Sequence, residues 1–369
     1  MKEIKKMKEK SVITRVIFAL LASVLFAACN PPIEEGVIKP YTCVVVNQGN
    51  FTESNGSISL YNRNTGEVQQ EVYNLANGRN FAAMIESVLL HNDLLIVMCN
   101  SEDKIVFVNA ITMQEVCAPI TNIGTPRYGV VKGSKLYVSC WSPTFMPGGG
   151  EEIAVIDLST KTKVASIPSN YYMPEGVQIV GENLYVAVEG GVDVYNTATN
   201  SYVTTLTSSQ SPRAIAQNMV SDKNGKLWVS MGGFYNDFWE IDNSQNGFMC
   251  IDPSTNDIIS QVLVPIMASD AEIAISPQKD KIYFISGDIF SDGHTPIYVF
   301  DVDSKTASGS PIITGEGFYG IGVEPYSGDI YTANIQNYIS NSNMYVYNAQ
   351  GVLQNTKLTG IATCRFVFQ

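Results

Sequence analysis

Short runs of β-branched and aromatic residues recur along the chain, and each run ends in Asn or Asp followed by small polar residues. The Asx positions that end these runs are 62, 109, 157, 196, 252, 301 and 348, so successive runs lie 47, 48, 39, 56, 49 and 47 residues apart. An Asx side chain accepts a hydrogen bond from the backbone two residues on, which is typical of a turn between strands. All-β units repeated at roughly 40–50 residues predict a β-propeller of seven blades.

The first repeat lacks one of its four expected strands. Strands A to D of a blade alternate in direction, so A–B and C–D turns share one face, while B–C loops and D–A junctions share the other. The chain offers six short polar A–B turns against seven C–D turns, because residues 41–47 already begin at strand B. Residues 365–368 can supply the missing inner strand. We therefore predict that residues 41–369 form seven four-stranded blades in a ring closed by the C-terminal strand, with no free sheet edge.

The long and irregular loops fall on only one of the two faces. They are B–C loops, the four longest being residues 47–56, 141–151, 232–247 and 334–343. We call the face that carries the B–C loops and D–A junctions the loop face. Function is commonly carried by loops that a rigid scaffold holds, so the loop face is the predicted working surface.

Aromatic residues are concentrated on the loop face. The loop 232–247 holds four of them within six residues: Phe234, Tyr235, Phe238 and Trp239. Trp141, Tyr128 and Tyr319 belong to other loops and junctions of the same face. Each ring covers about 150–250 Å². The rings of the long loop therefore either pack onto the propeller rim or line a site for a ligand or a partner.

A mixed ring of charges is expected beside the mouth of the central channel. Its members start successive A strands and are Arg127, Glu175, Arg213, Glu272 and Tyr319. Such a ring could bind a neutral, amide-rich or zwitterionic ligand through directed hydrogen bonds. Alternatively, the Arg and Glu side chains pair with each other around the axis.

The N-terminus has the pattern of a processed export signal. Five Lys and Arg15 precede the apolar run 16–28, which is too short for a bilayer span of about 20 residues. Residues 25–29 resemble the lipobox of bacterial lipoproteins, which implies a lipoprotein signal peptide over 1–28, acylation of Cys29 and a tether over 29–40. The acidic pair Glu34 and Glu35 resembles the surface-export signals of such lipoproteins. The alternative is an ordinary signal peptide cleaved after Ala28.

Charge and histidine content narrow the function classes. Residues 1–29 hold 6 of the 23 basic residues and 2 of the 35 acidic ones, so the remainder has 17 against 33 and a net charge of −16. Such a surface repels phosphate backbones, and nucleic acid is not expected as a partner. The two histidines, His91 and His294, fall on opposite faces, so no histidine-based metal site is expected. We predict no catalytic residues and no cofactor.

The repeat, together with residues 45–51 and 77–79, resembles the YncE-like seven-bladed propellers found on lipoproteins of gut anaerobes. That family includes a surface lipoprotein that captures cobalamin and caps a TonB-dependent transporter. The resemblance implies a lipid-anchored protein on the exterior of the outer membrane. It would bind a small molecule on the loop face, with a corrinoid as the leading candidate, and pass it to such a transporter. Two alternatives stay open: a scaffold that docks a protein or a glycan, and a lactonase- or lyase-like enzyme.

Overall fold

The computed structural model describes residues 37–142, 148–171, 173–235, 240–269, 272–289 and 293–369. The chain divides into two compact units, residues 1–37 and 38–369, and the second holds the described secondary structure. The predicted signal peptide, Cys29 and most of the tether lie outside the described residues. None of the helices in the described part of the chain has the length and apolarity that crossing a bilayer requires.

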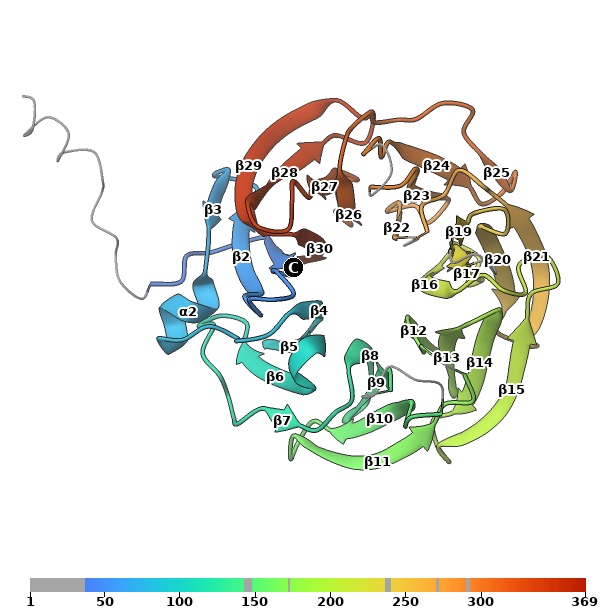
Figure 1. Ribbon diagram of the computed structural model, residues 1–369, viewed down its shortest axis with the longest axis horizontal. Coiled ribbons are helices and arrows are strands. Elements are labelled where there is room, and N and C mark those ends of the chain that lie inside the picture. The colour runs from blue at the N-terminus through green and yellow to red at the C-terminus, as the bar shows by residue number, and fades with distance from the viewer. Residues whose placement is uncertain (1–36, 143–147, 172, 236–239, 270–271, 290–292) are drawn as a thin grey trace, which may run out of the picture. The chain divides into compact units, whose positions relative to one another are not determined.

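Seven antiparallel four-stranded sheets form a ring around a central channel, which confirms the predicted seven-bladed propeller (Figure 1). From the innermost strand outwards the blades are β30 (Thr363–Phe368), β1 (Cys43–Asn47), β2 (Ser57–Asn62), β3 (Glu67–Gln69); β4 (Ile85–His91), β5 (Leu94–Cys99), β6 (Lys104–Asn109), β7 (Ile120–Thr121); β8 (Pro126–Lys132), β9 (Lys135–Cys140), β10 (Glu152–Asp157), β11 (Thr162–Pro168); β12 (Val177–Val180), β13 (Asn183–Val188), β14 (Gly191–Asn196), β15 (Ser201–Thr207); β16 (Ala216–Ser221), β17 (Leu227–Met231), β20 (Gly247–Asp252), β21 (Asp257–Leu263); β22 (Ile273–Ile275), β23 (Lys281–Ile285), β24 (Ile297–Asp301), β25 (Thr306–Ala307); and β26 (Phe318–Val323), β27 (Ile330–Asn334), β28 (Asn341–Tyr347), β29 (Leu353–Ile361).

The C-terminal strand closes the ring, as the missing strand of the first repeat predicts. Strand β30 pairs antiparallel with β1, and Phe366 lies opposite Val45 in the register. The first blade thus joins three strands from the N-terminal end of the propeller to one from its C-terminal end. Pairing β30 with β1 covers a strand edge that would otherwise be free to pair with another chain.

All seven predicted Asx turns are present at the outer C–D corners. In each turn the side-chain oxygen accepts a hydrogen bond from the backbone N–H two residues on, with N···O distances of 2.7–3.1 Å. The acceptors are Asn62, Asn109, Asp157, Asn196, Asp252, Asp301 and Asn348. The repeated Asx residues therefore mark structurally equivalent corners of the blades.

The hydrophobic core lies between neighbouring blades. The B and C strands are buried on both faces, as in β5 and β20, whereas the outer strand β11 alternates between exposed and half-buried residues along most of its length. Between the fifth and sixth blades, Trp228 meets Phe300 at 5.1 Å between ring centroids, and Phe248 meets Phe300 at 4.4 Å. The Trp228 indole N–H is satisfied by Asp222, 3.0 Å away. Aromatic packing of this kind holds adjacent blades together.

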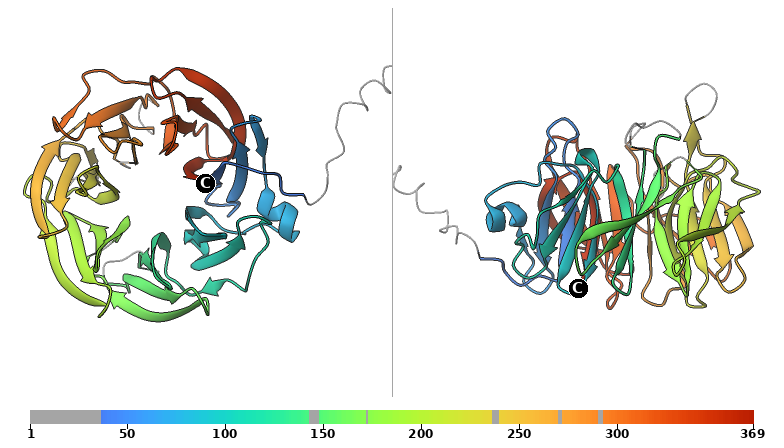
Figure 2. Two further views of the ribbon diagram at one scale, coloured as in Figure 1. Left: turned by 180° about the vertical axis from the view of Figure 1, so that it is seen from behind. Right: turned by 90° about the horizontal axis from the view of Figure 1, so that it is seen from below.

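Four short elements lie outside the blades. Strands β18 (Phe234–Tyr235) and β19 (Ile241–Asp242) pair as a hairpin within the long fifth B–C loop. Helix α2 (Val72–Asn77) follows β3, and the 3₁₀ helix η1 (Asn100–Glu102) follows β5. The hairpin rises from the loop face, and the C-terminus lies at the opposite face (Figure 2, right).

Candidate ligand-binding site at the mouth of the axial channel

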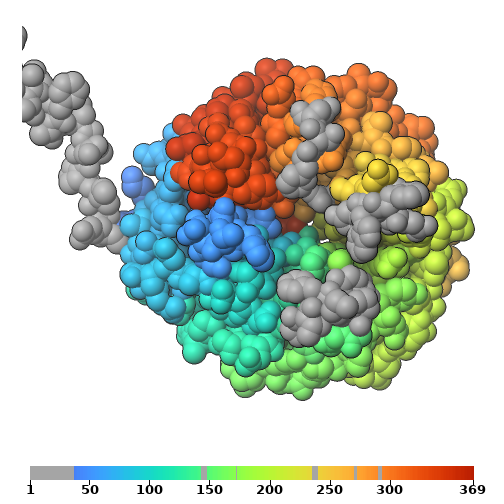
Figure 3. All heavy atoms as spheres, viewed as in Figure 1, coloured from blue at the N-terminus to red at the C-terminus, as the bar shows by residue number. Residues whose placement is uncertain are grey.

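A cavity of about 350 Å³ lies on the propeller axis at the loop face. Figure 3 looks onto this face and shows a hollow at the centre of the ring. The volume falls within the roughly 300–1,000 Å³ that small-molecule sites occupy. We call this space the axial cavity.

Two sets of equivalent backbone positions supply most of its polar side chains. One set lies at the loop-face start of the innermost strands, where β4, β8 and β30 place Glu86, Arg127 and Arg365, and where Glu175 and Glu272 precede β12 and β22. The other set is the first residue after a B strand and comprises Gln48, Asn100 and Trp141. Because neighbouring strands are antiparallel, both sets reach the same end of the channel.

Arg127 joins three blades through its guanidinium group. Its Nη1 lies 2.6 Å from Glu86 Oε2, and its Nε and Nη2 lie 3.1 and 3.2 Å from the two carboxylate oxygens of Glu175. Glu86 and Glu175 are buried, and only 2% of the Glu175 side chain is exposed. Bidentate pairs of this kind fix the orientation of both partners. Of the two interpretations of the charge ring, pairing of Arg with Glu around the axis therefore describes the contacts of Arg127.

Arg365 crosses the channel from the C-terminal strand. Its Nη1 and Nη2 donate to both carboxylate oxygens of Glu272 at 3.0 and 2.5 Å, and its Nη2 also donates to the Tyr128 hydroxyl. Arg365, Glu272 and Tyr128 also line a second cavity, of about 340 Å³, whose other walls are mainly apolar residues of the inner strands. These three side chains thus form the floor of the axial cavity.

The cluster is not neutral when fully ionised. Glu86, Glu175 and Glu272 supply three carboxylates against the guanidinium groups of Arg127 and Arg365. Burial raises the pKa of Glu175 to about 7, although Arg127 acts in the opposite direction. The net charge of the cluster therefore changes around neutral pH, and it does not become positive until Glu175 and a second carboxylate are protonated.

Two aromatic side chains form part of the wall. The Arg127 guanidinium lies over the Trp141 ring at 4.0 Å from its centroid, within the range of a cation–π contact. On the other side of the mouth, the Tyr319 hydroxyl donates to Gln48 Oε1 at 3.2 Å, and its ring meets Tyr338 edge-on at 6.3 Å. The walls therefore combine flat apolar surfaces with fixed polar groups, as ligand sites commonly do.

Two polar atoms of the wall are buried without a hydrogen-bond partner. They are Nε1 of Trp141, a donor, and Oδ1 of Asn100, an acceptor. The amide nitrogen of Asn100 donates to Glu86 Oε2 at 2.8 Å, and this contact sets the amide orientation that leaves the oxygen unpaired.

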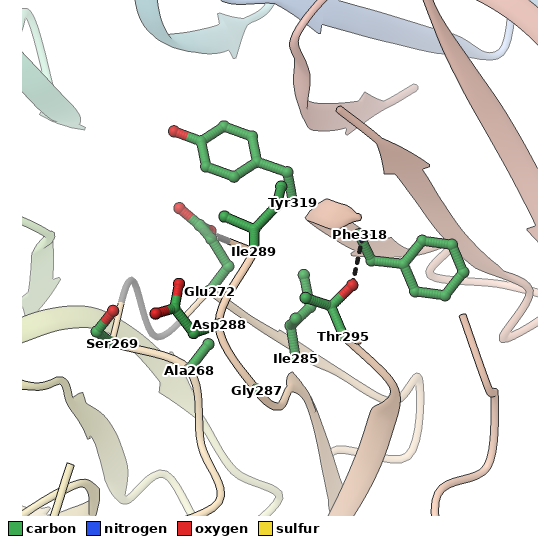
Figure 4. Close-up of a pocket in the computed structure, with 10 residues that line it drawn as sticks. All are labelled: Ala268, Ser269, Glu272, Ile285, Gly287, Asp288, Ile289, Thr295, Phe318 and Tyr319. Carbon is green, nitrogen blue, oxygen red and sulfur yellow. Dashed lines mark hydrogen bonds between the residues drawn. The ribbon is translucent and has the colours of Figure 1, made fainter. Parts of the chain in front are cut away.

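A small pocket of about 20 Å³ adjoins the axial cavity between the sixth and seventh blades (Figure 4). Glu272 and Tyr319 line both spaces, and Asp288 and Ser269 add polar atoms to the pocket. Its back wall is fixed by the Phe318 backbone N–H, which donates to Thr295 Oγ1 at 2.5 Å. The volume is sufficient for about one water molecule, so the pocket extends the polar rim without enclosing a ligand.

The structure brings together most, but not all, of the site residues proposed from sequence. Arg127, Glu175, Glu272, Tyr319, Tyr128 and Trp141 line the axial cavity. Arg213 is exposed and lies over the ring of Phe234 at 4.4 Å, and neither residue lines the cavity. Phe234 is only 7% exposed, so it packs into the base of the hairpin. Phe238, Trp239 and the side chain of Tyr235 lie outside the described residues.

Sequence reasoning missed Glu86, Arg365, Asn100 and Gln48, although the repeat contained the signal for each. Glu86 and Arg365 occupy the inner-strand position that singled out Arg127. Gln48 and Asn100 occupy the position of Trp141, directly after a B strand. Aligning the seven repeats position by position would have placed all four at the mouth. Within the part of the chain that the structure describes, no group of three or more His, Cys, Asp or Glu side chains is placed to hold a metal ion.

The fold and the axial cavity define the class: a seven-bladed β-propeller with a candidate ligand site on its loop face. Residues 41–364 match the model of the family described as Domain of unknown function (DUF5074), and the chain belongs to that family. No curated protein matches the sequence.

Solved propellers of other sequence have the same fold. A quinoprotein alcohol dehydrogenase-like protein from Bacteroides thetaiotaomicron is 15% identical with a TM-score of 0.64, over 89% of this chain and 78% of that one. BamB from Moraxella catarrhalis is 12% identical with a TM-score of 0.53, over 90% and 88%. Hydrazine synthase from Kuenenia stuttgartiensis is 14% identical with a TM-score of 0.59, over 74% and 85%. At these identities the similarity shows the fold alone.

Proposed function

We propose that the protein is a binding protein that holds a small neutral or zwitterionic molecule in the axial cavity. The observation that carries the proposal is the set of three carboxylates and two guanidinium groups, largely withdrawn from solvent, that surround a space of about 350 Å³. Burying ion pairs costs desolvation energy that their attraction often fails to recover. A channel that needed only structural filling would be filled more favourably by apolar side chains.

The pairing within the cluster argues against an anionic ligand. Both guanidinium groups already hold carboxylates in bidentate geometry, at Glu175 and at Glu272. An added anion would have to displace one of these partners or lie beside an excess of negative charge. A ligand that offers hydrogen-bond donors and acceptors without net negative charge meets neither obstacle.

A corrinoid remains a specific candidate, because it is broad, flat on its faces and rimmed with amides. It is larger than the axial cavity, so it would lie across the mouth with part of its rim inserted. The proposal also includes the predicted setting: a lipoprotein anchored through Cys29 to the outer membrane, facing outwards, that passes its ligand to a TonB-dependent transporter. The YncE-like resemblance supports this setting.

Calorimetric titration of the purified protein tests the proposal. Cobalamin and a panel of neutral, zwitterionic, cationic and anionic metabolites should be compared for the wild type and for Glu175→Gln. The matched control is Glu182→Gln, because the Glu182 side chain is 63% exposed in an A–B turn on the opposite face. We expect a neutral or zwitterionic ligand whose affinity changes only in Glu175→Gln. Binding of anions alone, or of nothing in the panel, would contradict the proposal, and a lack of cobalamin binding at high micromolar concentration removes the corrinoid.

A partner-docking role is favoured by a separate observation on the loop face. Phe51 and Ile339 are 72% and 71% exposed, and their loops are joined by the Asn50 side-chain amide, which donates to the Tyr338 carbonyl at 2.7 Å. Exposed apolar side chains that gather on one face mark protein interaction sites. Phe51→Ser with Ile339→Ser should reduce co-purification of a transporter with the protein. Tyr326→Ser, an 85% exposed residue of the opposite face, should leave it unchanged.

A further inference from the structure

The charged side chains of the axial cavity are bonded to one another. Each nitrogen of the Arg127 guanidinium donates to Glu86 or Glu175. Each nitrogen of the Arg365 guanidinium also donates within the protein, and both carboxylate oxygens of Glu272 accept from it. An ion pair that a ligand formed with any of these groups would have to replace a bond that the protein already makes. The charged groups therefore shape the cavity without offering free partners to a charged ligand.

Two glutamine side chains of the same cavity differ from the charged ones. Gln217 of β16 is half-buried, and in the described part of the chain neither atom of its amide group has a hydrogen-bond partner. Gln48, also half-buried, accepts from the Tyr319 hydroxyl through Oε1, whereas its Nε2 makes no described hydrogen bond.

The unbonded amide atoms of both glutamines are open to solvent. Five buried side-chain polar atoms lack a partner among the described residues, and none of the five belongs to Gln48 or Gln217. An amide atom that is neither bonded nor buried faces open space, and the axial cavity is the open space that both residues line. Gln217 belongs to the fifth blade and Gln48 follows β1 of the first, so the two amides reach the cavity from different sides of the ring.

We propose that the axial cavity takes an uncharged carbohydrate, which Gln217 and Gln48 select through hydrogen bonds. A hydroxyl group both donates and accepts, so separate hydroxyls of one ligand can serve the amide of Gln217 and the Nε2 donor of Gln48. Ile215, Met173 and the ring of Tyr319 are half-buried in the same wall and offer apolar surface to the C–H groups of a sugar ring. This inference rests on the proposed function and deepens it.

Five probes that share a pyranose ring separate hydrogen bonding from charge. Methyl glucoside, methyl galactoside and methyl mannoside are uncharged, glucosamine is cationic and glucuronate is anionic. Binding to the full-length protein at millimolar concentration is followed by NMR of the glutamine side-chain NH₂ resonances. Gln217→Leu and Gln48→Glu identify the two resonances of interest, because each substitution removes one of them.

We expect at least one of the three methyl glycosides to bind more tightly than both charged sugars and to shift the Gln217 resonance. Its affinity should stay the same from about 50 to about 500 mM NaCl, because salt screens charges and no ion pair with the ligand is formed. Ionic recognition would instead weaken over this range.

Gln217→Leu should weaken the glycoside about tenfold and leave the melting temperature unchanged, because this side chain makes no described hydrogen bond within the protein. Gln48→Glu keeps an oxygen for the Tyr319 hydroxyl and replaces the N–H donor, so it should also weaken the glycoside. Gln354→Leu is the matched control, since Gln354 is exposed on the outer strand β29, and it should leave the affinity unchanged.

The inference is overturned if none of the three methyl glycosides binds, if glucosamine or glucuronate binds more tightly than all of them, or if Gln217→Leu binds as tightly as the wild type. The proposed function is judged separately. A metabolite whose affinity depends on Glu175 but not on Gln217 would overturn the carbohydrate and retain the binding protein. Failure of both the glycosides and the metabolite panel would overturn both.

Discussion

At the scale of single residues, the buried carboxyl of Glu175 makes the stability of the protein depend on pH. Its carboxyl is buried among Arg127, Glu86 and Arg365, and burial raises its pKa from the ordinary value of 4.5 to about 7. The folded protein therefore binds this proton more tightly than the unfolded chain does. The resulting stabilisation is complete below about pH 4.5 and is lost as the pH rises through about 7.

Replacing Glu175 with Gln removes this titration. We expect the melting temperature of the wild type to fall relative to that of Glu175→Gln as the pH rises from 5 to 8, because only the wild type must keep a carboxylate buried. Differential scanning calorimetry of both proteins across this range measures the difference. A gap between the two proteins that stays constant with pH would show that Glu175 is ionised throughout and that Arg127 outweighs burial.

The Asx residues should contribute to stability one at a time. Asn109 Oδ1 accepts from the backbone N–H groups of Ile111 and Thr112, both at 2.9 Å. Asn109→Ala leaves these donors to water, so we expect a loss of about 1 kcal/mol in the free energy of unfolding, measured by urea denaturation. Asn224→Ala is the control, because Asn224 lies in an exposed A–B turn and only its backbone N–H makes a described hydrogen bond. An equal effect of the two substitutions would contradict a special role for the Asx oxygen.

At the scale of elements, β30 serves as both a closing strand and a wall of the site. Deleting residues 364–369 exposes the edge of β1 and removes Arg365, so we expect a large drop in melting temperature together with aggregation. Calorimetry and size-exclusion chromatography measure the two effects.

Arg365→Met separates these two roles. It keeps the strand and its pairing but leaves Glu272 without its bidentate partner, so we expect a less stable protein that is still monomeric. A truncated protein that stays monomeric with an unchanged melting temperature would show that β30 is not needed to close the ring.

The sequence predicted the strands and their order, but it predicted the directions of the side chains only in part. The Asx spacing and the missing inner strand of the first repeat were sufficient for seven blades, their order and the role of β30, because these follow from periodicity and strand direction. The same alternation of strand direction placed Arg127, Glu175 and Trp141 on one face. It could not tell that Arg213 turns outward over Phe234, because side-chain direction in a loop depends on tertiary contacts rather than on period.

The repeat pattern also could not predict that Arg365 extends across the axis to Glu272. It depends on the width of the channel, which the seven sheets determine together, and on the open space beside Glu272. The unpaired atoms of Asn100 and Trp141 could not be predicted either, since burial without a partner is a property of the assembled cavity.

At the scale of the whole molecule, the predicted acylation of Cys29 can be tested by cell fractionation. Cys29→Ala removes the acylation site, so we expect the protein to move from the membrane fraction to the soluble fraction, followed by immunoblotting. Cys117→Ala is the control, because Cys117 is a partly exposed free thiol of the propeller. If Cys29→Ala is processed at its signal peptide and still sediments with membranes, attachment has another cause.

The pairing of β30 with β1 also determines when in biosynthesis the site can exist. Every other strand of the propeller precedes β30 in the chain, and β30 carries the arginine that forms the floor of the axial cavity. During synthesis, six complete blades can form before the first blade receives its inner strand. A chain interrupted before residue 363 would therefore have neither a closed ring nor a complete axial cavity.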